Sequence, residues 1–174
     1  YVLRAATLIK EARRNILIGT GFPVEKSFET DGPLGAIALY KTIEKLGANP
    51  IIVCSDLLAR SLRNQFQVIA LPTLGNTDAK SLDAARVIKL YSPELIICIE
   101  APGIAKDGKY YNIQGVDISS FCVDFDSMVG QALCKTVAIG DGGNEVGMAK
   151  VWRNINFAHT TPCVTGCDEL VVAD

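Results

Sequence analysis

The fold is decided by the stretch TVAIGDGGNEVGM at residues 136–148, in which an apolar run meets a glycine-rich turn. Residues 136–139 form an unbroken apolar and β-branched run, as expected of a strand buried on both faces. Glycine then permits positive φ and a close approach of the backbone to a ligand, while Asp141, Asn144 and Glu145 add polar side chains. We therefore expect a strand, a functional turn and then a helix over residues 145–152.

Similar strand candidates recur along the chain and alternate with helical patterns. Short apolar runs predict strands at 15–19, 50–54, 67–71, 95–99 and 169–173, and apolar residues spaced by three and four predict helices at 1–14, 31–46, 57–64, 76–90 and 124–133. This alternation predicts one α/β domain over residues 1–174, in which a mostly parallel, Rossmann-like sheet lies between two layers of helices.

The composition narrows the class of protein. Of 174 residues, 49% are hydrophobic and 21% are charged, and the net charge is −2, which is typical of a globular domain with an ordinary core. A nucleic-acid-binding protein is not indicated, because the charge is not basic. No apolar run approaches the roughly 20 residues of a membrane span. The six cysteines show no disulfide pattern, which favours a reducing compartment and a cytoplasmic location.

Acidic residues follow several of the expected strands or open the helices after them. They are Asp31, Asp56, Glu100, Asp141 and Glu145. The carboxyl ends of parallel strands share one edge of the sheet, so these side chains are expected to meet in one cleft. Gathered carboxylates raise one another's pKa values, which suits acid–base chemistry, and they also suit a divalent cation. Each of them can instead cap a helix or close a turn, and for Asp31 the capping role is equally favoured.

Three further patterns are weak. Gly19-Thr20-Gly21 lacks the third glycine and the clear acidic partner of a dinucleotide-binding fingerprint. His159, Cys163 and Cys167 have a spacing that zinc ligands use, but no second cysteine pair accompanies them. A nucleophilic serine elbow is absent from the sequence.

Several motifs taken together resemble the D-glutamate cyclase C-terminal domain family. They lie at residues 19–22, 29–33, 100–103, 107–112, 115–119 and 139–148, and the similarity runs from about residue 16 to the end of the chain. Cys163, Asp168 and the run at 170–173 also resemble the end of the family's domain. The family usually continues into a Ser-Asn-Trp-Gly segment, so the domain is expected to be cut short at its C-terminal end.

The resemblance implies a hydro-lyase that converts D-glutamate to 5-oxo-D-proline and water. Strand-end position and residue type then suggest roles at the site. The expected catalytic residues are Asp31, Glu100, Asp141 and Glu145. The expected substrate-binding residues are Gly21, Asp56, Lys106, Lys109, Tyr110, Tyr111, Asn112, Gly142, Gly143 and Asn144. Asp141 and Glu145 are also candidate ligands of a divalent cation, Mg²⁺ or Mn²⁺, and the amides of Gly142 and Gly143 are expected to face a developing negative charge.

Two other functions stay open at this point. A non-catalytic domain that binds a nucleotide or an acidic metabolite would use the same glycine-rich turn as an anion site. A different hydro-lyase or amide-forming enzyme could use the same scaffold, because a fold does not fix a substrate. The expected partner is a small acidic molecule rather than nucleic acid or membrane, with a homo-oligomer as an open possibility. Animal members of the family are mitochondrial, so the mitochondrial matrix is the alternative location.

Overall fold

A computed structural model describes residues 1–24, 27–75, 83–151 and 161–172 of the chain. Among the helices of these ranges, none combines the length and the apolar character that crossing a bilayer requires.

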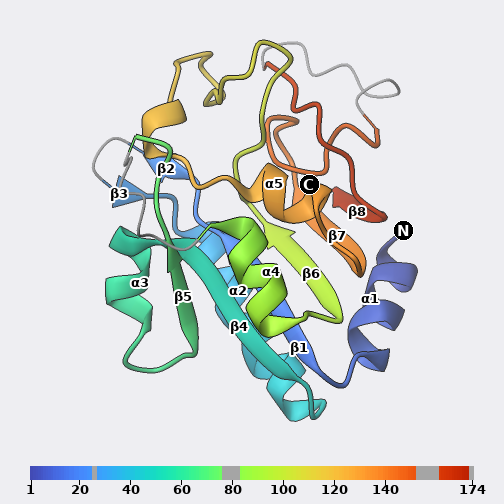
Figure 1. The fold of residues 1–174 in the computed structure, drawn as a ribbon. Coiled ribbons are helices and arrows are strands. Elements are labelled where there is room, and N and C mark those ends of the chain that lie inside the picture. Colours follow the sequence, from blue (N-terminus) through green and yellow to red (C-terminus); the bar gives the residue numbers. More distant parts are fainter. Residues whose placement is uncertain (25–26, 76–82, 152–160, 173–174) are drawn as a thin grey trace.

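The described residues form a parallel sheet of six strands (Figure 1). The strands are β1 (Asn15–Thr20), β4 (Asn49–Ser55), β5 (Val68–Leu71), β6 (Leu95–Ile99), β7 (Lys135–Gly140) and β8 (Glu169–Val172). Their spatial order is β5-β4-β1-β6-β7-β8, so the chain first builds outward from β1 on one side and then returns to build outward on the other. This is the doubly wound order of Rossmann-like folds, and it confirms the predicted fold class.

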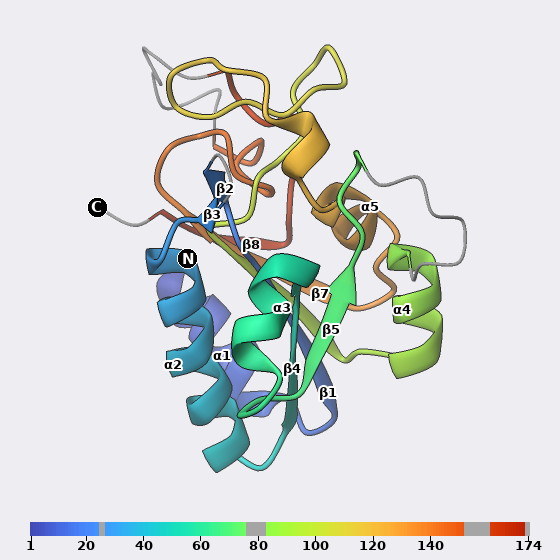
Figure 2. The same ribbon diagram turned by 90° about the vertical axis from the view of Figure 1, so that its left-hand side faces the viewer.

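Helices cover both faces of the sheet (Figures 1 and 2). On one face α1 (Val2–Glu11), α2 (Asp31–Lys45) and α3 (Asp56–Leu62) pack on sheet residues such as Ile18 and Ile97. On the other, α4 (Ala84–Tyr91) and α5 (Phe125–Gly130) pack on residues such as Leu17 and Ile96. Because the central strands are fully buried on both faces, they carry continuous apolar runs rather than an alternating pattern.

One expected helix is wrong. Residues 145–151 form turns and isolated bridges instead of the first part of a helix over 145–152. Gly147 has a φ of +94°, and its N–H donates to the carbonyl oxygen of Thr165 at 3.0 Å. Glu145 bridges to Pro102 on the other side of the turn. These contacts with distant segments hold the backbone in non-helical conformations, so no helix N-terminus faces the sheet edge here.

One further helix starts later than expected, and the structure contains short elements that were not expected. Helix α4 begins at Ala84 with Asp83 as its N-cap, so its start lies after the expected one, and residues 76–82 lie outside the described ranges. A two-stranded antiparallel hairpin, β2 (Pro23–Val24) and β3 (Ser27–Phe28), follows β1 and was not expected. A 3₁₀ turn, η1 (Ser119–Phe121), lies near the end of the long loop that follows β6, which was expected to be irregular. All six cysteines are free, as expected.

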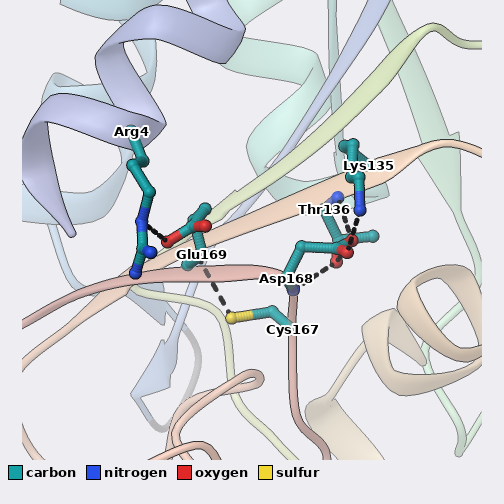
Figure 3. A network of polar contacts seen from close by, with 6 residues as sticks. All are labelled: Arg4, Lys135, Thr136, Cys167, Asp168 and Glu169. Carbon is teal, nitrogen blue, oxygen red and sulfur yellow. Dashed lines mark hydrogen bonds and ion pairs between the residues drawn. The ribbon is translucent and has the colours of Figure 1, made fainter.

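A polar network fixes the amino ends of β7 and β8 (Figure 3). The Asp168 carboxylate accepts hydrogen bonds from the N–H and the hydroxyl of Thr136 at 2.8 and 2.9 Å and pairs with Lys135 Nζ at 2.9 Å. Arg4 of α1 pairs with Glu169 at 3.2 Å. The family-like Asp168 therefore has a structural role at the edge of the sheet opposite to the acidic turn.

Glycine is required where the loops above the sheet pack on one another. A Cβ on Gly103 would lie 2.3 Å from Cys163 Sγ and 2.7 Å from the backbone nitrogen of Val146. With any other residue at position 103, the segments that carry these three residues could not pack as closely as they do. By contrast, a Cβ on Gly130 at the end of α5 would meet nothing within 4 Å.

We expect Gly103→Ala to lower the free energy of unfolding by at least about 2 kcal/mol, because the added methyl group overpacks a contact that includes backbone. Gly130→Ala should be neutral or stabilise by up to about 0.5–1 kcal/mol, since alanine favours a helix. Urea denaturation of the two variants checks this. Equal stability of both variants would contradict the proposed packing.

Candidate active site

The strand order reverses between β1 and β6, and the carboxyl ends of such strands are where open α/β sheets bind ligands. Glu100 follows β6 and Asp141 follows β7. Oxygen atoms of Glu100, Asp141 and Glu145 lie within 4.8 Å of one another. Electrostatic repulsion couples Glu100 to Asp31 and Glu29 as well. We call these five carboxylates, Glu29, Asp31, Glu100, Asp141 and Glu145, the acidic cluster.

Glu100 lies at the centre of the cluster in an unusual backbone conformation. Its φ is +43°, which a residue with a side chain adopts rarely and which is common at functional sites. Its N–H donates to the carbonyl oxygen of Ile139 at 3.0 Å, so the chain turns sharply as it leaves β6. Gly32 at the start of α2 lies directly against it, because a Cβ there would be 2.7 Å from Glu100 Cβ. The first turn of α2 therefore forms one wall around Glu100.

Glu145 is held inside its own turn. Its side chain is only 3% exposed, and its two carboxylate oxygens accept hydrogen bonds from the N–H groups of Gly142 and Gly143, each at 2.8 Å. A Cβ on Gly140 would lie 3.0 Å from Glu145 Cβ, so glycine makes room for the side chain. The amides of Gly142 and Gly143 thus bind Glu145 in this structure, and not a developing charge on a substrate as the sequence suggested.

Burial, together with repulsion between the acids, raises the pKa values of Glu29, Glu100 and Glu145. Desolvation raises the pKa of Glu100 to about 8, and repulsion from Glu145, Asp141 and Asp31 adds to the shift. Burial raises the pKa of Glu145, although its hydrogen bonds from Gly142 and Gly143 act in the opposite direction. Partial desolvation and the neighbouring acids also raise the pKa of Glu29. Glu100 therefore holds its proton near neutral pH.

Some residues expected at the site lie elsewhere. Asp56 forms ion pairs with Arg60 at 2.6 Å and Arg63 at 3.2 Å, on the exposed side of α3. Lys109 pairs with Asp117 at 2.9 Å, and Lys106 is exposed on the same loop. The structure does not bring these three side chains into the acidic cluster.

The long loop after β6 uses most of its polar groups on itself. Tyr110 is buried in a small apolar core, and its hydroxyl group forms a hydrogen bond with the Asp126 carboxyl group. The Tyr111 hydroxyl donates to Asp107 at 2.6 Å, and Asn112 Oδ1 accepts two backbone N–H groups of its own turn. Asn144 is buried and its Nδ2 donates to the carbonyl oxygen of Tyr111 at 2.9 Å, so it joins this loop to the acidic turn.

Sequence reasoning missed one member of the cluster. Glu29 is the first residue of the family-like motif at residues 29–33, and its position two residues before Asp31 was the sequence signal that could have placed it at the site. The β2–β3 hairpin places it, because the N–H of Glu29 donates to the carbonyl oxygen of Phe22 at 2.9 Å. Gly21 has a φ of +115° and lines a neighbouring pocket rather than the cluster.

The donors at the site fit a hard cation better than zinc. Glu100, Asp141 and Glu145 offer only oxygen atoms, which Mg²⁺, Mn²⁺ and Ca²⁺ prefer. Cys163 is buried, and its Sγ accepts the N–H of Thr165, whereas Cys167 Sγ donates to the carbonyl oxygen of Glu169. The third residue of the zinc hypothesis, His159, lies outside the described residues. Neither cysteine belongs to a group of candidate metal ligands in the described part of the chain.

Fold and site together define a doubly wound α/β domain with a carboxylate-lined site at its topological switch point. The chain belongs to the family described as D-glutamate cyclase-like, C-terminal, whose model matches residues 1–174. It is 30% identical over 200 aligned positions to the human protein named "D-glutamate cyclase, mitochondrial". The alignment covers 99% of this chain and 32% of the human protein, so the chain spans about a third of that relative. The family resemblance inferred from the motifs is confirmed.

The raised pKa of Glu100 should make the stability of the metal-free protein depend on pH. The folded carboxyl keeps its proton to about pH 8, whereas the ordinary carboxyl value is 4.5, so between these values the folded state binds more protons and stability falls as pH rises. Denaturation in EDTA from about pH 5 to pH 9 should show this fall, and Glu100→Gln should reduce it. Glu44→Gln, an exposed change on α2, should keep the full fall. An identical slope in Glu100→Gln and wild type would contradict the assignment.

Proposed function

We propose that this domain carries the chemistry of a D-glutamate cyclase-type hydro-lyase, which converts D-glutamate to 5-oxo-D-proline and water. The observation that supports it most is the acidic cluster, in which carboxylates from α2 and from the ends of β6 and β7 meet at the point where this fold binds ligands. Membership of the D-glutamate cyclase-like family supports the choice of substrate.

The reaction is mainly a transfer of protons. The α-ammonium nitrogen loses two protons and forms a bond to the carbon of the γ-carboxyl group, while one oxygen of that group gains two protons and leaves as water. Groups that accept protons near nitrogen and return them near oxygen are therefore required. Asp31 and Asp141 are exposed, so they are available to a substrate ammonium, and Glu145 is too enclosed to move. Asp31 at the start of α2 is our candidate for the proton acceptor.

A dicarboxylate substrate also needs its charge balanced. None of the ion pairs within the described residues involves the acidic cluster, so no lysine or arginine of these ranges neutralises it. Three atoms spaced by 4.8 Å or less share a point within about 2.8 Å of each, close to the roughly 2.0–2.6 Å of Mg²⁺ and Ca²⁺ ligand bonds. Glu100, Asp141 and Glu145 would hold a divalent cation. When bound, it would supply positive charge to the γ-carboxyl group.

The alternative of a nucleotide- or anion-binding domain gains no support. It needs free amides in the glycine-rich turn, but those of Gly142 and Gly143 already donate to Glu145. The helix N-terminus expected after the turn is also absent from residues 145–151. The surrounding carboxylates would repel phosphate groups.

We expect Asp31→Asn and Asp141→Asn each to lower kcat/KM for D-glutamate by about 10²-fold or more, the usual worth of a positioned acid–base group. Both side chains are exposed, so the variants should stay folded. Glu44→Gln on the same helix as Asp31 removes an exposed carboxylate away from the cluster and should keep full activity. Chromatographic measurement of 5-oxo-D-proline checks this, and a folded wild-type chain that forms none above the uncatalysed background would overturn the proposal.

EDTA treatment should abolish turnover, and Mg²⁺ or Mn²⁺ should restore it, because the cation offsets the repulsion between the acidic cluster and the two substrate carboxylates. Full turnover in metal-free buffer would show that protons alone neutralise the cluster. The same D-glutamate assay reports both results, with circular dichroism as the control for folding.

A further inference from the structure

A second feature lies beside the acidic cluster and has no role in the proposed reaction. It is a cavity of about 250 Å³ at the carboxyl ends of β1, β4 and β5. We call it the hairpin pocket, and its lining includes Gly21, Phe28, Asp56, Leu57, Pro72 and Phe121. The β2–β3 hairpin borders it on one side and η1 contributes Phe121.

The hairpin pocket presents apolar side chains to solvent. Phe121 in η1 is 52% exposed, and Leu57 in the first turn of α3 is 47% exposed. Phe28 adds a second, partly buried aromatic ring. Exposed apolar groups that line a concavity are typical of a site for an apolar ligand group, and phenyl side chains in that lining suit a planar aromatic one.

The pocket and the acidic cluster share a wall. Gly21 follows Thr20, whose Oγ1 would lie 3.0 Å from a Cβ on Gly32 and so lies next to the Glu100 stem. Phe28 lines the pocket, and the next residue, Glu29, belongs to the cluster. A molecule whose reacting group lies at the cluster can therefore extend a substituent past Gly21 into the pocket.

Charge favours a substrate with a neutral γ-group. The cluster contains five acidic side chains, and no lysine or arginine of the described residues forms an ion pair with them. A substrate with a free γ-carboxylate would add a further negative charge. A γ-amide is neutral, so it avoids that repulsion. The carbonyl carbon of a γ-amide is also easier for the α-amine to attack than the carbon of a negatively charged γ-carboxylate.

We propose that the domain accepts γ-amides of D-glutamate that carry an apolar aromatic substituent, with the glutamyl part at the acidic cluster and the aromatic ring in the hairpin pocket. In this reaction the α-nitrogen bonds to the carbonyl carbon of the γ-amide, and the bond from that carbon to the amide nitrogen breaks. One proton passes from the neutral α-amine to the departing nitrogen, which leaves as an arylamine. The products are 5-oxo-D-proline and the arylamine, and no oxidant or other reactant is needed. The inference rests on the cyclisation chemistry proposed above, but not on free D-glutamate as its substrate.

The test compares γ-D-glutamyl-4-nitroanilide with γ-D-glutamyl methylamide. Both cyclise by the same bond changes, but they differ in the size of the substituent and in the leaving ability of the amine, so each rate is read against its own uncatalysed rate. Release of 4-nitroaniline is followed by absorbance and 5-oxo-D-proline by chromatography. We expect kcat/KM for the anilide to exceed that for the methylamide by at least about tenfold, after correction for the uncatalysed rates, as expected when an apolar group fills a pocket.

Variants locate the preference. Phe121→Ser should lower the anilide-to-methylamide ratio of kcat/KM by about tenfold, because the ring loses an apolar contact. Leu133→Ser is the matched control, since Leu133 is 98% exposed and does not line the pocket, and it should leave the ratio unchanged. Phe121 is half exposed, so the fold should tolerate its replacement.

The outcomes separate this inference from the proposed function. Turnover of D-glutamate without any preference for the anilide would overturn the inference alone. Turnover of the anilide with the stated ratio, but none of D-glutamate, would support the inference and remove the hydro-lyase activity. An equal ratio in wild type and Phe121→Ser would also overturn the placement of the ring in the hairpin pocket.

Discussion

The candidate site depends on one buried interaction, the carboxylate of Glu145 bound by the amides of its own turn. These hydrogen bonds fold residues 141–145 back on themselves and bring the Glu145 carboxylate close to Glu100 and Asp141. The turn is held from both sides, because Gly103 donates to the carbonyl oxygen of Asn144 and the N–H of Cys163 donates to that of Gly143, at 2.8 and 2.9 Å. A carboxylate satisfied in this way is costly to displace, so the other acids must adjust to it.

Much of the fold could be predicted from the sequence, because its signals are local. Strands such as β6 are unbroken apolar runs, and α2 is followed by Gly47 with positive φ, as expected of a glycine after a helix. The N-cap of α2 is Thr30, however, and not the expected Asp31, which is the first residue of the helix. The helix expected after Glu145 failed for a non-local reason. Its backbone N–H groups bond to residues near 101 and 165, and a sequence pattern of one segment carries no information on such partners.

The site was predictable only in its acids. Strand-end position correctly brought Glu100, Asp141 and Glu145 together, since that follows from a parallel sheet. The substrate-binding residues expected on the loop at 106–119 rested on residue type, and polar residues in a long loop often stabilise the loop itself. Tyr111, Asn112 and Lys109 do so here. Gly21 and Asp56, which were expected to bind substrate, line the hairpin pocket, but its apolar lining could not be predicted because it comes from segments far apart in the sequence.

Two glycines pack directly against the acidic side chains of the site, and this changes what alanine scanning measures there. Glu100 lies against Gly32, and Glu145 lies against Gly140, so closely that a methyl group on either glycine would meet the acidic side chain. Systematic replacement by alanine normally removes atoms and reports what a side chain contributed. At these two positions it inserts atoms into the contact, so a large effect there would measure crowding of the acids and not the loss of a functional group.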